Sequence, residues 1–157
     1  MPQSPDPKSL AVPGSSELPP IVERTVMVTR ALRNAAGQLM ERALADRAAG
    51  TLSKSDLLKV QDQYQSIIDA ANRAVYEATA RLPPMANDFA QVEAATRQLE
   101  QALLQVRHFT ETLVLTAKLL LAVGALVTLV LQPNPGTATA TAAAIADVVK
   151  TIRDQAK

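Results

Sequence analysis

Residues 113–136 read LVLTAKLLLAVGALVTLVLQPNPG, and residues 113–131 of this stretch decide which folds are open to the chain. Their only charged residue is Lys118. A helix over residues 113–131 is ~28 Å long at ~1.5 Å per residue, close to the ~30 Å hydrocarbon core of a bilayer. A helix that is apolar on every side is also suited to the centre of a soluble bundle. We therefore predict an apolar helix that lies either in a membrane or in a buried core.

Transfer free energies permit this helix to enter a membrane. Its eight leucines and four valines contribute roughly −4 to −7 kcal/mol on an insertion scale. Lys118 costs about 2.5 to 3.5 kcal/mol at the bilayer centre, and less near a helix end, where its side chain reaches the headgroups. However, the chain has no tryptophan, and neither of its two tyrosines lies near this segment, whereas membrane spans are commonly flanked by such residues.

The apolar pattern extends beyond this segment in the N-terminal direction. Along residues 88–132 a stripe of mostly apolar residues recurs at alternating spacings of three and four, and no strong helix breaker interrupts it. This pattern predicts one helix of about 45 residues, ~67 Å long. Two small residues on its seam, Ala117 and Gly124, allow a second helix to approach closely. The residues predicted to contact a membrane or a partner helix are Leu113, Ala117, Leu120, Gly124, Val127 and Leu131.

The preceding part of the chain, residues 21–112, is predicted to form an amphipathic helical bundle that begins with a helical hairpin. Pro20 suits the first turn of a helix, and Gly50 suits the residue after its last turn. Ser53 with Asp56 three residues later resembles a capping box, which predicts the start of the second helix.

The two ends of the chain have different compositions. Residues 1–20 contain six prolines and four serines, so they are predicted to be a disordered tail. Residues 132–157 begin with the breaker sequence QPNPG, in which Asn134 can cap a new helix. They are predicted to form a turn and a short C-terminal helix.

These elements together predict an all-α, four-helix, coiled-coil-like bundle. Apolar residues make up 48% of the chain, but aromatic residues only 3%. The core must therefore consist of leucine, valine, isoleucine and alanine, which suit helix packing better than sheet packing.

We find no catalytic, cofactor-binding or metal-binding signature in the sequence. His108 is the only histidine, and it is preceded at the third position by Gln105 rather than by a glutamate. The two Glu-x-x-His pairs of a carboxylate-bridged di-metal bundle are therefore missing. There is no cysteine, and the five glycines are isolated, so no phosphate-binding loop is present. We expect a protein that is not an enzyme and has no cofactor.

The net charge of +1 and the lack of a basic cluster give no reason to expect a nucleic-acid partner, and no small-molecule substrate is expected. No general secretory signal peptide is predicted. One hypothesis is a membrane-associated protein that contacts or enters lipid through residues 113–131 and presents a helical bundle for protein interaction. The alternative is a soluble, cytoplasmic helical-bundle adaptor or chaperone-like module that self-associates or whose apolar helix is covered by a partner.

Overall fold

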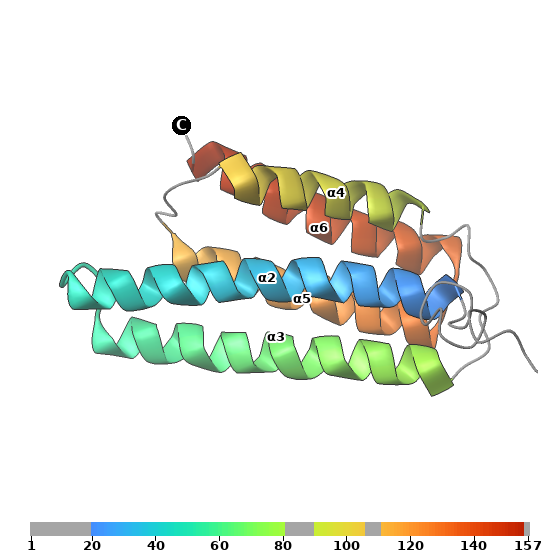
Figure 1. Cartoon of the computed structure of the whole chain (residues 1–157), viewed down its shortest axis with the longest axis horizontal. Helices are drawn as coiled ribbons and strands as arrows, with labels where there is room; N and C mark the ends of the chain where they lie inside the picture. The colour runs from blue at the N-terminus through green and yellow to red at the C-terminus, as the bar shows by residue number, and fades with distance from the viewer. Residues whose placement is uncertain (1–19, 81–89, 106–110, 156–157) are drawn as a thin grey trace, which may run out of the picture.

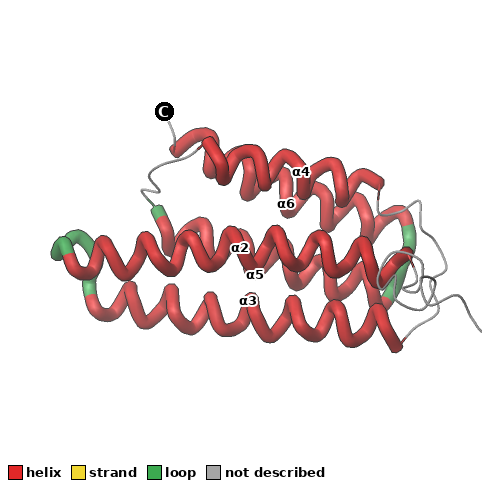
Figure 2. The backbone as a smooth tube through the Cα atoms, viewed as in Figure 1, coloured by secondary structure: helices red, strands yellow, loops and turns green. Residues whose placement is uncertain are grey.

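A computed structural model of the chain describes residues 20–80, 90–105 and 111–155. Within these ranges every regular element is a helix and there is no β-strand, so the predicted all-α class is confirmed (Figures 1 and 2). The described part contains five helices, which means that the predicted count of four is wrong. The helices are α2 (Pro20–Ala48), α3 (Lys54–Ala80), α4 (Ala90–Gln105), α5 (Thr112–Leu131) and α6 (Pro135–Gln155).

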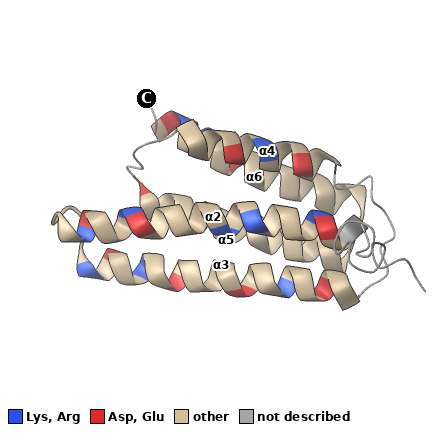
Figure 3. Ribbon diagram, in the orientation of Figure 1, with Lys and Arg blue, Asp and Glu red and all other residues tan. Residues whose placement is uncertain are grey.

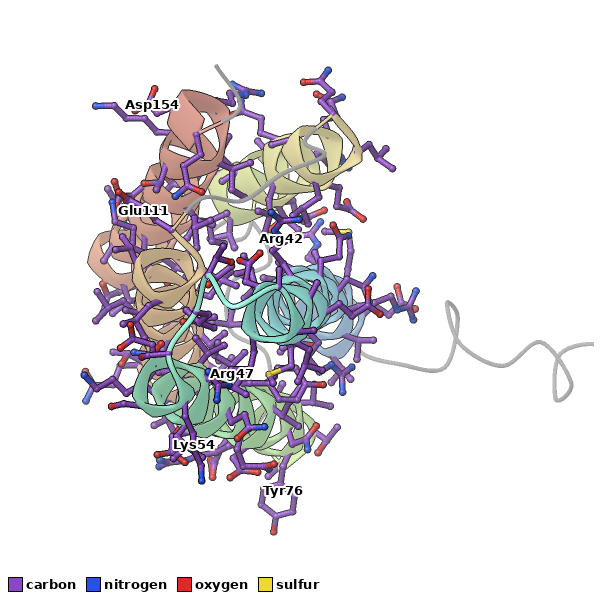
Figure 4. All side chains as sticks on the ribbon, turned by 90° about the vertical axis from the view of Figure 1, so that its left-hand side faces the viewer. Arg42, Arg47, Lys54, Tyr76, Glu111 and Asp154 are labelled. Carbon is purple, nitrogen blue, oxygen red and sulfur yellow. The ribbon has the colours of Figure 1, made fainter. Side chains whose placement is uncertain are left out.

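Helix α5 has the most central position in the bundle. It packs against α2, α3 and α6, whereas α4 packs against α6 and along α2. In the end-on view of Figure 4, α6, α5 and α3 follow one another along one side of the molecule, with α4 and α2 beside them. No contact joins α4 to α5 among the described residues. The apolar segment is therefore covered by three helices, and one of its sides faces outward between α3 and α6.

The predicted single helix over residues 88–132 is wrong, because the structure divides it into α4 and α5. The two helices run in opposite directions (Figure 1), with α4 ending at Gln105 and α5 beginning at Thr112. This reversal lets α5 bury one face among three other helices, which a straight continuation of α4 would not allow. Glu111, before the first turn of α5, makes no side-chain capping hydrogen bond. The start of α5 therefore lacks the side-chain cap that is present at the starts of α3 and α6.

The other predicted turn signals are confirmed by their geometry. Gly50 has a φ of +80° after the end of α2, a conformation that glycine adopts without the steric penalty of a Cβ atom. The hydroxyl of Ser53 accepts a hydrogen bond from the backbone N–H of Asp56 at 3.0 Å, as an N-cap should. These contacts connect α2 to α3, and the two helices pack against each other in opposite directions.

The C-terminal helix is longer than predicted. The side chain of Asn134 accepts a hydrogen bond from the backbone N–H of Thr137 at 2.9 Å, so the helix begins directly after the turn. Its 21 residues include the alanine- and threonine-rich stretch that precedes Ile145. Alanine is the strongest helix former. Thr141 in this stretch is buried, and its hydroxyl donates to the carbonyl of Ala125 on α5 at 3.0 Å.

The buried face of α5 forms the centre of the core. Its fully buried large side chains are Leu115, Leu119, Leu126 and Leu129. The buried hydrophobic residues of the described helices are leucine, isoleucine, valine and alanine, as the composition predicted. Two sequence predictions concern parts of the chain outside the described residues: the tail over residues 1–20, apart from Pro20, and the surroundings of His108.

Two leucines on opposite faces of α5 provide a test of this arrangement. Leu126 is fully buried, and Leu126→Ala should lower the free energy of unfolding by about 2 to 5 kcal/mol because it leaves a cavity in the core. Leu121 is 71% exposed, and Leu121→Ala should change the free energy by at most about 0.5 kcal/mol. Urea denaturation followed by circular dichroism, at low protein concentration, measures both values. Equal losses in the two variants would contradict the assigned orientation of α5.

Candidate interaction surface

The outward side of α5 is a row of small and apolar residues between α3 and α6. We call it the outer strip, and it consists of Val114, Ala117, Leu121, Gly124, Ala125 and Thr128. These residues follow one another at spacings of three and four, with the single step from Gly124 to Ala125, so they share one face of the helix. Leu121 is 71% exposed and Val114 is 42% exposed. The strip is therefore an uncharged surface with one large apolar side chain near its middle.

The only charge of the apolar segment lies at the border of this strip and is paired with α6. The ammonium group of Lys118 lies 3.2 Å from a carboxylate oxygen of Asp147 on α6 and donates to the hydroxyl of Thr151 at 2.8 Å. Figure 3 shows charged residues distributed along α2, α3 and α4, with little charge on α5. Because Lys118 is neutralised by α6, the outer strip presents no net charge to a partner.

Polar contacts also fix the rotation of α5 about its own axis. Thr116 is buried, and its hydroxyl lies within hydrogen-bonding reach of the side-chain carbonyl oxygen of Gln63 on α3 and of the Leu113 carbonyl. On the opposite side, the Ala125 carbonyl accepts the hydrogen bond from Thr141 on α6. Buried hydroxyl groups need such partners to offset the loss of water. These contacts hold the same side of α5 outward along its length.

A groove between α3 and α5 borders the outer strip. Its lining comprises Asp69, Ala70 and Arg73 on α3 and Gly124, Val127, Thr128 and Leu131 on α5. A Cβ atom added to Gly124 would meet no other atom within 4 Å, so this glycine lies beside open space. Asp69 accepts a hydrogen bond from Gln65 at 3.0 Å, and Arg73 has no ion pair with a described residue. The groove thus combines an apolar floor with one acidic and one basic side chain at its rim.

The six residues that the sequence analysis singled out lie mostly at the border of the core. Val127 is buried at 7% exposure, whereas Gly124 is exposed. The remaining four are partly buried: Leu113, Ala117, Leu120 and Leu131. Leu120 packs against the core but is only partly buried, whereas the neighbouring Leu119 is fully buried. A segment that is apolar on every side fits a three-and-four stripe in any rotation, so periodicity could not select the buried face.

Lys118 is the sequence signal that could have identified the outer strip. A charged residue in an apolar helix usually lies near the water-facing side. Val114 and Leu121 are separated from it by four and three residues, and they consequently share that side. Both are exposed in the structure. Asp69 and Arg73 could not have been found in this way, because only the packing of α3 on α5 brings them to the groove.

A second hollow lies where the turn between α2 and α3 meets the start of α5. Its lining includes Arg42, Asp46, Asp56 and Glu111. Arg42 and Asp46 lie one helical turn apart and form an ion pair at 3.1 Å. Among the described residues, no group of three or more histidine, cysteine or acidic side chains is arranged to hold a metal ion. The absence of catalysis and of cofactors stays a prediction.

Comparison with known proteins found no matching family model, and no curated protein or solved structure is significantly similar to the chain. Functional inference therefore starts from the surface of the bundle itself. Among the described helices, α5 is the one long and apolar enough to cross a membrane, and half of it is buried inside the bundle. Length and composition alone do not separate a membrane span from the core helix of a bundle.

The contact between Lys118 and Asp147 can be measured with a double-mutant cycle. Both side chains are partly exposed, so the pair should contribute a coupling energy of about 0.5 to 1 kcal/mol, which falls at high salt. Lys118→Met, Asp147→Asn and the double variant are compared by chemical denaturation. The matched control is a cycle between Lys118 and Asp69 on α3, which should give no coupling. Coupling of the same size in both cycles would mean that Lys118 is not directed to α6.

Proposed function

We propose that this protein is a non-enzymatic helical-bundle module that self-associates or binds a partner helix through the outer strip of α5. The observation that supports this proposal best is the 71% exposure of Leu121 in the middle of an uncharged strip. Most large apolar side chains of α5 are buried, and Leu121 is the most exposed of them. Contiguous apolar surface with a polar rim is typical of protein interaction sites.

Burial of this strip by a partner supplies a driving force. Full burial of one leucine side chain contributes about 1.5 to 3 kcal/mol. Val114, Ala117 and Ala125 on either side of Leu121 would add to this contribution. The neighbouring charged residues of α3 and α6 then form a polar rim around the contact, which is the usual composition of such interfaces.

In this conformation, transfer of α5 into lipid would be less favourable than contact of its outer strip with a protein partner. Its buried face already contacts α2, α3 and α6, and lipid tails are no more apolar than the leucines that cover it. Entry into a bilayer would also separate Lys118 from Asp147. Only the outer strip would gain apolar surroundings, whereas the contacts with three helices would be lost.

Membrane association is the second candidate function, with the length and apolar composition of α5 in its favour. It would require α2, α3 and α6 to move away from α5 before residues 113–131 enter lipid. The bundle of the remaining helices would then be presented for protein interaction at the membrane surface. Vesicle flotation separates the two candidates: the proposed module stays with the soluble fraction, whereas carbonate-resistant flotation of the full chain supports membrane insertion and contradicts our proposal.

A charge placed in the outer strip tests self-association. Leu121→Glu should shift the sedimentation coefficient to that of a monomer and raise the dissociation constant by at least about tenfold, because a carboxylate cannot be buried without a partner. Circular dichroism should remain unchanged, since Leu121 does not contribute to the core. Leu104→Glu is the matched control, because Leu104 on α4 is 87% exposed and lies outside the strip.

Analytical ultracentrifugation of the full chain over a range of concentrations measures these values. A wild-type chain that stays monomeric at high concentration would contradict self-association. Equal dissociation constants for wild type and Leu121→Glu would exclude the outer strip as the contact surface.

A further inference from the structure

We propose that the partner of the outer strip is a second copy of this chain, bound across a two-fold axis that passes beside Gly124, with the two α5 helices antiparallel. This inference rests on the proposed function and specifies the partner and the geometry. It is based on three observations. The first is the shape of the strip, in which Leu121 projects beside the small residues Gly124 and Ala125. The others are its lack of charge and the order of Asp69 and Arg73 along the rim of the α3–α5 groove.

The shape of the outer strip is complementary to a second copy of the same strip. Leu121 projects from it, whereas Gly124 and Ala125, one turn later, leave a low area beside open space. A projection and a low area on the same surface patch are what a two-fold contact requires, since each copy then contributes both features. The absence of a side chain at Gly124 allows the two helix backbones to come close at their crossing point.

The relative direction of the two α5 helices follows from the positions of Leu121, Gly124 and Ala125 along the helix. In a parallel pair, Leu121 would lie opposite Leu121 of the second copy, so that the two projections would meet. In an antiparallel pair with the axis at Gly124, Leu121 of one copy lies over Ala125 and Thr128 of the other. The antiparallel arrangement also places opposite ends of the two helix dipoles together. It is therefore the arrangement in which Leu121 of each copy meets the small residues of the other.

The charged residues at the rim of the α3–α5 groove are also complementary across the proposed two-fold axis. Asp69 and Arg73 are one helical turn apart on α3, and both line the groove that contains Gly124. An antiparallel two-fold pair brings the α3 rim of one copy next to the α3 rim of the other. Asp69 then lies opposite Arg73 of the second copy, and Arg73 lies opposite its Asp69, which gives two equivalent ion pairs. A parallel pair would instead place α3 against α6.

Charge reversal tests this reciprocity. Asp69→Arg and Arg73→Asp should each raise the dissociation constant of the dimer about tenfold, because each replaces two attractive contacts with two repulsive ones. The variant that carries both changes restores the opposite charges and should return the dissociation constant to within about threefold of the wild type. Glu100→Arg, on the exposed surface of α4, is the control and should leave dimerisation unchanged.

Cysteine cross-linking tests the position and direction of the axis. The natural chain has no cysteine, so each introduced thiol can be interpreted without background. Gly124→Cys should form a disulfide-linked dimer under mild oxidation, because a residue on a two-fold axis meets its own copy. Leu121→Cys should link efficiently to Thr128→Cys in a mixture of the two variants, but not to itself. Leu104→Cys should stay monomeric at the same concentration.

The outcomes separate this geometry from the proposed function. Self-linkage of Leu121→Cys indicates parallel helices and overturns the inference. A dimer that is lost in Leu121→Glu but unaffected by the charge reversals, with no linkage through Gly124→Cys, also overturns the inference while the proposed function stands. A hetero-partner helix or a membrane as the sole ligand would leave the isolated chain monomeric, and this result overturns the inference. Rescue by the double reversal together with linkage through Gly124→Cys supports it.

Discussion

The apolar surface of α5 is the constraint on which the rest of the structure depends. A helix with almost no polar side needs cover in nearly every direction, and the chain provides three neighbours, α2, α3 and α6. The fold-back between α4 and α5 makes this cover possible, since it brings α6 onto α5 while α4 supports α6 from behind. Three neighbours leave one side of the helix open, and the outer strip is that side.

Sequence reasoning was reliable where the structure is determined locally. The helix start at Ser53, the glycine turn at Gly50 and the cap at Asn134 depend on residues within one turn of each other. The all-α class followed from composition and periodicity. The break between α4 and α5 was missed because it depends on which helices cover the apolar segment, and no proline or glycine near Glu111 signals it. The length of α6 was underestimated because its alanine- and threonine-rich stretch has little amphipathic pattern of its own.

The candidate surface was only partly predictable for the same reason. Ala117 and Gly124 were identified as small residues suited to close approach, and they lie at the outward side of α5. The pairing of Lys118 with Asp147 involves residues 29 positions apart in sequence, and the groove beside Gly124 needs α3 in place. Such relations arise from tertiary packing, which periodicity along one helix does not contain.

The order of the helices along the chain has a consequence for biosynthesis. Helices α2 and α3 can pair as soon as residue 80 has left the ribosome, but the helix that packs against both of them ends only at Leu131. At about 5 to 20 residues per second, translation of the intervening ~50 residues takes roughly 3 to 10 s. During that interval the faces of α2 and α3 that contact α5 in the finished bundle have no α5 to pack against. The nascent chain thus exposes its hydrophobic surface to chaperones, or to other nascent chains, before the helix that completes its core emerges from the ribosome.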